Sequence, residues 1–132
     1  MKVDVILNGR ATTLDVRSDE MLLEALDLRE TCGIGVCGAC TVLVDGEPVT
    51  GCLTLAPQAA GREVTTVEGL DEADPVKRAF AEAHAFQCGW CTPGFVLTVK
   101  AARPQEVVDL GGNLCRCGCY VKIEETVRRC VS

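Results

Sequence analysis

Aromatic side chains and long apolar runs are both scarce in this sequence of 132 residues. Only 4% of the residues are Phe, Trp or Tyr, which leaves little apolar surface for cores in halves of about 65 residues. No apolar run approaches the roughly 20 residues of a membrane-spanning helix. Polar residues such as Asp4 and Asn8 stand where a signal segment would be apolar. We therefore expect a cytoplasmic chain without membrane contact, held together by more than an apolar core.

Clustered basic residues are also missing. The formal net charge is −6, whereas a nucleic-acid surface needs Lys and Arg gathered on one face. The sequence contains no phosphate-binding loop, no dinucleotide fingerprint and no nucleophile–base pair, and it has one histidine. These absences argue against nucleic-acid binding and against a substrate site on this chain.

Cysteine, in contrast, is abundant. Ten cysteines are present, and such a content indicates either a disulfide framework or metal sites. A reducing compartment keeps thiols free, so the expected cytoplasmic location favours thiolate ligands over disulfides.

The first group of cysteines follows the pattern C-x4-C-x2-C-x11-C. Its members are Cys32, Cys37, Cys40 and Cys52. The spacing is typical of plant-type [2Fe-2S] ferredoxins, in which four thiolates hold two irons. Gly33, Gly35 and Gly38 lie between the cysteines, and glycine reaches the positive φ values of a sharply bent loop. A zinc site is the alternative, and the ferredoxin-like spacing makes it the weaker one.

The second group consists of a C-x2-C pair and a C-x-C pair. Its members are Cys88, Cys91, Cys115 and Cys117. Neither pair completes a four-thiolate site alone, but both together do. We expect the first pair to enter a helix N-terminus, which favours thiolate, and the second pair to lie in irregular backbone. Zinc stays open as an alternative, as does a thioredoxin-like redox pair, although no βαβ pattern surrounds Cys88 and Cys91.

Three segments resemble the small iron–sulfur subunit of the molybdenum hydroxylases, the family of xanthine dehydrogenase, aldehyde oxidoreductase and aerobic carbon monoxide dehydrogenase. They are Cys37-Gly-Ala-Cys-Thr-Val-Leu-Val-Asp-Gly46, Gln87-Cys-Gly-Trp-Cys-Thr-Pro-Gly94 and Gly112-Asn-Leu-Cys-Arg-Cys117. The segments occur in the family's order and span most of the chain. The resemblance therefore covers both groups of cysteines.

The resemblance implies an α+β fold in two parts. Residues 1–70 would form a β-grasp domain of the plant-type ferredoxin kind, and residues 74–132 a four-helix [2Fe-2S] domain. The two groups of cysteines would hold two [2Fe-2S] clusters. Gln87 would contact the pterin cofactor of a partner subunit, and Cys117 would be the ligand nearest to that pterin.

The same resemblance implies electron transfer within a hetero-oligomeric oxidoreductase. Single electrons would pass from a large molybdenum-binding subunit, which carries a molybdenum–pterin cofactor, through the two clusters to a medium FAD-binding subunit or another acceptor. The substrate site would lie on a partner subunit. Two other functions stay open: a free-standing ferredoxin-like electron carrier and an interaction module held together by zinc.

Local patterns predict the elements of the first part. Asn8-Gly9 and Asp45-Gly46 are hairpin signals between runs rich in β-branched residues. Ser18 with the acidic residues after it predicts a cap and a helix over about 19–28. We expect a turn of helix at Cys52 and a last strand over 63–67. Strands, one helix and more strands favour a mixed sheet packed on a helix.

Two cap-and-proline signals predict helix starts in the second part, after a linker over 71–75. They are Asp74-Pro75 and Thr92-Pro93. Apolar residues at helical spacing predict four helices. Their approximate ranges are 75–86, 92–102, 104–110 and 120–130.

Two cysteines remain outside the ligand groups. The family usually continues Thr-Gly-Tyr after its last ligand, whereas this sequence has Gly118-Cys-Tyr120. We expect Cys119 to be a buried bystander, with metal ligation or a place next to the pterin as alternatives. We expect that Cys130 is not a ligand.

The single histidine and the single tryptophan of the chain lie near the second group and also need an interpretation. His84 is expected on a helix surface or in packing, because all eight ligands are assigned without it. Trp90 is expected to shield the cluster. The chain also lacks residues that the family carries before Cys32 and between Cys91 and Cys115, which affects partner contacts more than the ligand groups.

Overall fold

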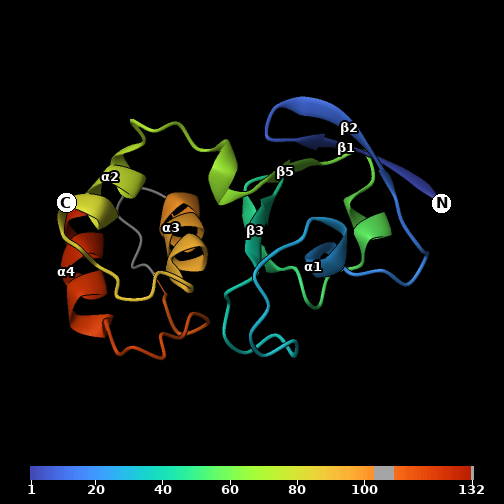
Figure 1. Ribbon diagram of the computed structural model, residues 1–132. Coiled ribbons are helices and arrows are strands. Elements are labelled where there is room, and N and C mark those ends of the chain that lie inside the picture. The colour runs from blue at the N-terminus through green and yellow to red at the C-terminus, as the bar shows by residue number, and fades with distance from the viewer. Residues whose placement is uncertain (103–108, 132) are drawn as a thin grey trace.

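The computed structural model describes residues 1–102 and 109–131. A sheet with a short helix and a group of longer helices lie side by side, and the two termini lie at opposite ends of the molecule (Figure 1). The predicted α+β fold is confirmed. Among the described residues, no helix is long and apolar enough to cross a membrane.

The sheet has five strands in the order β2-β1-β5-β3-β4. They are β1 (Lys2–Leu7), β2 (Arg10–Asp15), β3 (Thr41–Val44), β4 (Glu47–Thr50) and β5 (Glu63–Thr65). β1 and β5 pair in parallel, and the other neighbours pair antiparallel. The mixed sheet favoured by the order of elements is therefore present.

Two tight turns connect the hairpins, as predicted. Asn8 and Gly9 have φ values of 51° and 82°, and Asp45 and Gly46 have φ values of 51° and 81°. Two consecutive positive φ values match the right-handed twist of the flanking strands. Asn8 also fixes the turn to β5, because its Oδ1 accepts from Thr66 N–H at 2.9 Å.

The first helix, α1 (Leu22–Ala25), is much shorter than the predicted helix over 19–28. Its cap is Met21, without a side-chain hydrogen bond, so the cap predicted at Ser18 is wrong. Met21 forms a β-bridge with Leu55, which holds this stretch of backbone extended. At the other end Asp27 has a φ of 50° and stops the helix.

The acidic residues that suggested the helix start bind Arg17 instead. The guanidinium lies 3.3 Å from Asp19 Oδ1, 3.1 Å from Glu20 Oε1 and 3.1 Å from Glu24 Oε2. Asp19 and Glu20 therefore belong to a surface ion-pair network rather than to the first helical turn, and only Glu24 lies in α1.

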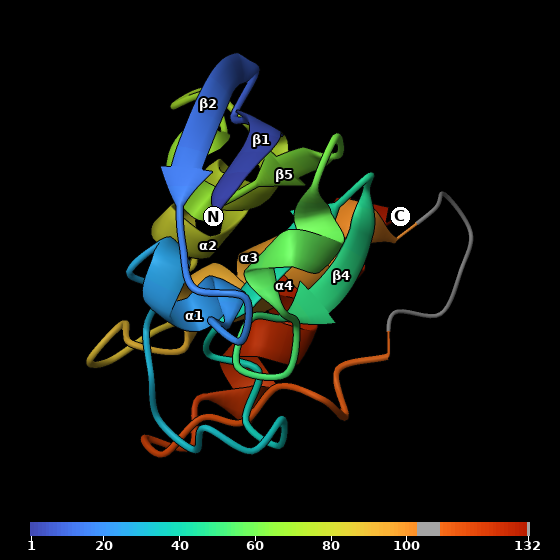
Figure 2. The ribbon, with the colours of Figure 1, turned by 90° about the vertical axis from the view of Figure 1, so that its right-hand side faces the viewer.

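One apolar core lies between the sheet, α1 and the 3₁₀ helix η1 (Ala56–Ala59). Its fully buried members include Leu22, Val42 and Val64. The turned view shows β1, β2 and β5 next to one another with α1 below them (Figure 2). Small β-branched residues fill this core in place of the missing aromatic side chains.

Two expectations for the rest of the first part are wrong. Cys52 lies in a non-helical turn, and the 3₁₀ helix η1 begins only after it. The last strand ends at Thr65 instead of residue 67, because η2 (Val67–Gly69) turns the chain toward the second part.

The second part begins with α2 (Pro75–Glu82). Asp74 caps it as predicted: Oδ1 accepts from the N–H groups of Val76 and Lys77 at 2.9 and 3.2 Å. The helix ends four residues before the predicted Phe86, because His84 has a φ of 49° and the chain turns there.

Two further helices are described, α3 (Thr92–Ala101) and α4 (Tyr120–Val131). Cys91 rather than the predicted Thr92 is the cap of α3. The predicted helix over 104–110 lies mostly outside the described residues, and Asp109 and Leu110 are not helical.

The three helices enclose a second apolar core. It contains Phe80 of α2, Phe95 of α3 and Ile123 of α4, which are at most 2% exposed. Asp74 and Lys100 form an ion pair at 2.6 Å across this part. Burial disfavours the Asp74 carboxylate, but the Lys100 ammonium and the capping N–H groups outweigh it and hold the pKa of Asp74 below its usual value. α3 also packs on β3 and β4 and so joins the two parts.

Candidate metal centres

The first group of cysteines lies in the loop between α1 and β3 and in the turn after β4. Gly33, Gly35 and Gly38 have φ values of 69°, 78° and 72°, which confirms the sharply bent loop. A Cβ atom at Gly35 would lie 2.2 Å from Leu53 Cδ1. The Leu53 side chain thus packs directly over the backbone of Gly35, which brings the turn after β4 against the loop.

Cys32 accepts three backbone hydrogen bonds on its sulfur. The donors are the N–H groups of Ile34, Val36 and Cys37, at 3.4, 3.3 and 3.4 Å. Hydrogen bonds to the charged form lower a pKa, and these three, led by that of Ile34, lower the pKa of Cys32 to about 6. The loop thus favours the thiolate, the form that binds a metal.

The sulfurs of the first group lie in two pairs. Cys32 and Cys37 are in hydrogen-bonding contact, and so are Cys40 and Cys52. Gly35 N–H donates to Cys52 Sγ at 3.2 Å. Burial raises the pKa of Cys52, and the contact with Cys40 raises it further. Cysteines distant in sequence, at positions 40 and 52, are therefore brought together by the fold.

The second group forms two pairs as well. Cys88 contacts Cys117, and Cys91 contacts Cys115. Cys88 and Cys91 precede α3. Before α4, Cys115 lies outside any regular element and Cys117 lies in a turn, which confirms the irregular backbone predicted for them. Each pair therefore joins the connection before α3 to the connection before α4.

The pKa values in this group shift in opposite directions. The N–H of Trp90, 3.5 Å from Cys88 Sγ, is the main cause that lowers the pKa of Cys88. Burial and then the contact with Cys115 raise the pKa of Cys91 to about 12. Burial also opposes ionisation of Cys115, but the N–H of Cys119 and the Cys91 thiol outweigh it and lower its pKa.

The donor atoms can be compared with what each metal needs. Within residues 1–102 and 109–131, no three His, Cys, Asp or Glu side chains converge as around a single ion. A [2Fe-2S] cluster instead spreads four thiolates over two irons, so each iron would need one pair of cysteines. Two neighbouring pairs in each group match that donor set, and the backbone N–H groups directed at sulfur suit its negative charge.

Backbone contacts connect the two groups. Leu114 N–H donates to the carbonyl oxygen of Cys37 at 2.8 Å, and Asn113 Nδ2 donates to that of Gly38 at 3.5 Å. Leu114 directly precedes Cys115. A single hydrogen bond therefore separates the backbone beside a cysteine of the second group from a cysteine of the first.

Glycine permits this close approach. A Cβ atom at Gly94 in α3 would lie 2.2 Å from Gly38 O, and one at Gly38 would lie 2.3 Å from Gly112 O. Both distances are far shorter than any tolerated contact with backbone. The first loop, α3 and the segment before Cys115 are thus packed backbone against backbone.

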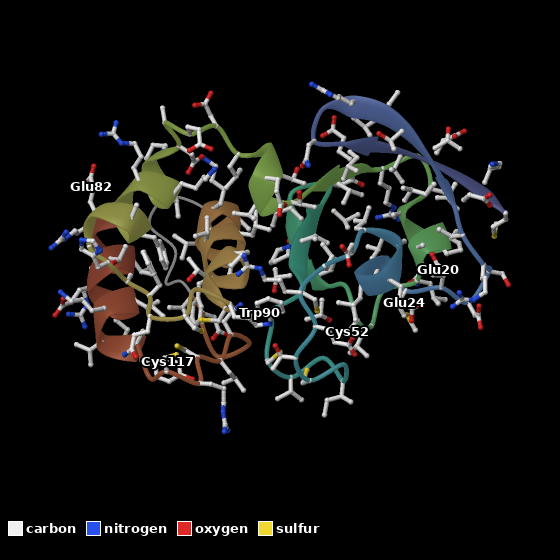
Figure 3. All side chains as sticks on the ribbon, viewed as in Figure 1. Glu20, Glu24, Cys52, Glu82, Trp90 and Cys117 are labelled. Carbon is white, nitrogen blue, oxygen red and sulfur yellow. The ribbon has the colours of Figure 1, made fainter. Side chains whose placement is uncertain are left out.

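A second connection runs through Arg29 and Trp90. Arg29 Nη1 donates to the carbonyl oxygens of Gly89 and Trp90 at 2.6 and 3.1 Å, and its Cζ lies 5.0 Å from the indole centroid, a cation–π geometry. Trp90 Nε1 donates to Thr31 Oγ1 at 2.9 Å. Figure 3 labels Trp90 between Cys52 and Cys117. Trp90 thus connects the segment before Cys32 to the loop after Cys88. That Trp90 shields a cluster from solvent stays a prediction.

The structure also brings Gln87 and Cys117 together, the two residues assigned to the pterin by resemblance. Gln87 Nε2 donates to the carbonyl oxygen of Cys117 at 3.4 Å, and the Gln87 side chain is exposed. His84 is exposed after the end of α2, with its ring 6.2 Å from that of Phe86, in keeping with the predicted surface position.

The sequence did not predict the role of several residues that support the two groups. Arg29, Asn113 and Tyr120 had no assigned role, although Tyr120 Oη accepts from Cys115 N–H at 2.7 Å. Asn113 lies inside one of the quoted motifs, so only its position there signalled it. Cys130 lies in the second apolar core, where burial and then Asp74 raise its pKa.

Exposed apolar side chains lie in the segments that carry both groups. Ile34, Val36 and Leu53 are 68%, 51% and 58% exposed around the first group. Leu114 and Val121 are 44% and 70% exposed beside the second. Exposed apolar side chains that cluster in this way mark interaction surfaces.

Comparisons with protein families match both parts of the chain. A family described as "2Fe-2S iron-sulfur cluster binding domain" matches residues 11–92, and a family described as "[2Fe-2S] binding domain" matches residues 66–128. Together the two matches include all eight cysteines of the two groups.

Individual proteins are similar over nearly the whole chain. The nicotine 6-hydroxylase small subunit of Paenarthrobacter nicotinovorans is 42% identical over 96% of this chain and 87% of its own length. The nicotinate dehydrogenase small FeS subunit of Eubacterium barkeri is 39% identical over 98% and 94%. The crystal structure of quinoline 2-oxidoreductase from Pseudomonas putida 86 superposes with a TM-score of 0.87 at 35% identity, over 96% of this chain and 90% of that one.

Proposed function

The chain belongs to the small iron–sulfur subunits of the molybdenum hydroxylases, and we propose that each of its two groups of cysteines holds one [2Fe-2S] cluster. The proposed ligands are Cys32, Cys37, Cys40 and Cys52 for the first cluster, and Cys88, Cys91, Cys115 and Cys117 for the second. As a member of this family the chain takes part in electron transfer within an oxidoreductase. When bound, the clusters supply one-electron chemistry.

The arrangement of the thiols in pairs carries the proposal. Each pair supplies two sulfurs for one iron, and in the second group each pair spans two connections between helices. The protein's own contribution is to hold these sulfurs and direct N–H groups at them. Hydrogen bonds to sulfur and solvent exposure set the potential of such a site, so the different surroundings of the two groups give them different potentials.

We also propose that residues 1–70 and 74–132 are separate domains. Two distinct apolar cores support this division, one under the sheet and one among the helices. Each proposed domain carries one group of cysteines. The contacts of the Gly38 carbonyl with the Gly94 backbone and with the Asn113 side-chain amide then belong to the interface between the domains.

The chain is one subunit of a larger enzyme, since its relatives are small subunits. We propose a large partner that binds a molybdenum–pterin cofactor next to Gln87 and Cys117. The exposed amide of Gln87 and the half-buried Cys117 support that side of the second group as the contact. The exposed residues Leu114 and Val121 beside it supply apolar area for a stable interface.

A medium FAD-binding subunit is the proposed acceptor, and it would cover the first group. Ile34, Val36 and Leu53 support a second contact there, because they expose apolar surface over the first loop. A cytoplasmic location is part of the proposal as well. It is supported by ten cysteines that are all free thiols in the structure, which suits a reducing compartment.

The test is a metal and partner analysis of the natively purified complex. Two clusters give four iron and four labile sulfide per chain, with two distinct electron paramagnetic resonance signals after reduction. Cys117→Ala should remove one signal and Cys52→Ala the other, and large subunits should copurify. Zinc in place of iron would establish the interaction module instead. A monomer with both clusters and no partner would establish the free-standing carrier.

A further inference from the structure

Cys119 is a buried thiol that the proposed ligand groups leave unexplained. It is 9% exposed and belongs to the apolar core of the helical part. It precedes α4 directly, and Ile123 N–H donates to its carbonyl oxygen at 3.0 Å. The backbone at this position is therefore fixed by the first turn of a twelve-residue helix, and the thiol has a defined place rather than a mobile one.

The surroundings of the Cys119 sulfur are specific. The N–H of Gln87 donates to Cys119 Sγ, and on its other side Cys119 Sγ is in hydrogen-bonding contact with Cys115 Sγ. The backbone N–H of Cys119 also donates to Cys115 Sγ, at 3.5 Å. Cys119 thus links the loop before Cys88 to one of the proposed ligands.

These contacts fix the direction of the hydrogen bond. Cys119 Sγ already accepts from an N–H, and as a cysteine outside both ligand groups it carries an S–H. Cys115 as a metal ligand is a thiolate and accepts only. The S–H of Cys119 is therefore the donor, and the N–H behind it strengthens that donor through the chain of hydrogen bonds.

A donor to a ligand sulfur has a defined electrostatic effect. Reduction adds negative charge to the site, and a hydrogen bond to the thiolate stabilises the more negative state more strongly. Partners of first-shell ligands also fix ligand orientation. Removing the donor should thus make the site harder to reduce without removing a ligand.

We propose that Cys119 is a positioning residue whose S–H group donates to Cys115 Sγ and raises the reduction potential of the second site. This inference rests on the proposed function, because it needs Cys115 to be a ligand. It does not need Cys119 as a ligand, because Cys115 pairs with Cys91 and Cys117 pairs with Cys88.

The experiment is a redox titration of the purified complex, followed by electron paramagnetic resonance. Cys119→Ala removes the donor, and Cys119→Ser keeps a hydroxyl donor in its place. Cys130→Ala is the matched control, since it removes the other spare thiol of the same apolar core, which faces Asp74. At a fixed potential, Cys119→Ala should lower the ratio of reduced to oxidised second site by about threefold to tenfold. The tenfold limit equals about 59 mV for a one-electron couple.

The remaining results have defined meanings. Cys119→Ser and Cys130→Ala should titrate like the wild type, and the first site should keep its potential in all variants. An unchanged potential in Cys119→Ala would overturn the proposal, as would complete loss of the second signal in both Cys119 variants, which would make Cys119 a ligand. A wild-type complex without a second iron–sulfur signal would instead overturn the proposed function, and the role of Cys119 with it.

Discussion

The backbone N–H of Leu114 donates to the carbonyl oxygen of Cys37 at 2.8 Å. Each partner is either a proposed ligand or the direct neighbour of one, and the two belong to different groups of cysteines. The hydrogen bond thus joins the backbone of one group directly to that of the other. The relative position of the two groups therefore depends on the interface between the proposed domains as well as on the loops that carry the cysteines.

Gly94→Ala should destabilise the protein, although alanine in a helix interior is normally favourable by about 1 kcal/mol. The added Cβ would lie 2.2 Å from Gly38 O, and overpacking of this kind costs about 1–3 kcal/mol. Thermal unfolding of the purified complex measures the change. Gly112→Ala is the control, because a Cβ there has no atom within 4 Å. Equal melting temperatures for the two variants would show that α3 does not approach the loop as described.

Removal of iron should unfold the helical part while the sheet keeps its structure. The proposed ligands of the second site join the connections before α3 and α4, so metal-binding energy there is folding energy. Circular dichroism of protein treated with a chelator and a reductant measures helicity and cooperativity. Cys117→Ala should lose helicity in the same way without a chelator. Full helicity and cooperative melting in the metal-free protein would contradict the stabilising role of the site.

Thiol alkylation of metal-free protein should distinguish Cys32 from Cys52. The pKa of Cys32 is lowered to about 6 by three N–H groups, so its thiolate persists at pH 7 and is lost as the pH falls through about 6. Burial raises the pKa of Cys52, so its thiolate forms only in alkaline solution. Mass spectrometry after brief treatment with iodoacetamide between pH 5 and 9 measures both. If alkylation of the two thiols depended on pH in the same way, the N–H groups of the loop would not be bound to Cys32 in the metal-free protein.

Arg29→Ala should loosen the loop that contains Trp90. The change removes two hydrogen bonds to carbonyl oxygens and a cation–π contact, together about 1–3 kcal/mol. The expected result is a lower melting temperature and an indole that reacts faster with N-bromosuccinimide. Arg29→Lys should restore little, because an ammonium lacks the planar fork. Arg17→Ala, which removes the three ion pairs of an exposed guanidinium, is the control and should leave indole reactivity unchanged.

Local signals in the sequence predicted the features that depend on a few adjacent residues. Asn8-Gly9 and Asp45-Gly46 specify their turns because few other residue pairs adopt two positive φ values. Asp74 was predictable as a cap because its carboxylate needs only the next helical turn. The cysteine spacing predicted the two groups, since glycines next to the thiols permit the bends.

Features that depend on distant residues were not predictable. α1 is short because Met21 pairs with Leu55, and no local pattern around Met21 reports that bridge. The contacts of Arg29 with Trp90 and of Asn113 with Gly38 join residues that are about 60 or more positions apart. Cys119 had the same difficulty, because its role depends on Gln87 and Cys115 arriving at one sulfur from two connections.

The single tryptophan of the chain has an experimental consequence of its own. Trp90 touches the segment before Cys32 and lies two residues after Cys88, so one fluorophore stands beside both groups of cysteines. Iron–sulfur centres absorb in the near ultraviolet and visible range and quench nearby indole emission. The intrinsic fluorescence of this chain is therefore an optical reporter of cluster insertion, and maturation can be followed in real time without any added label.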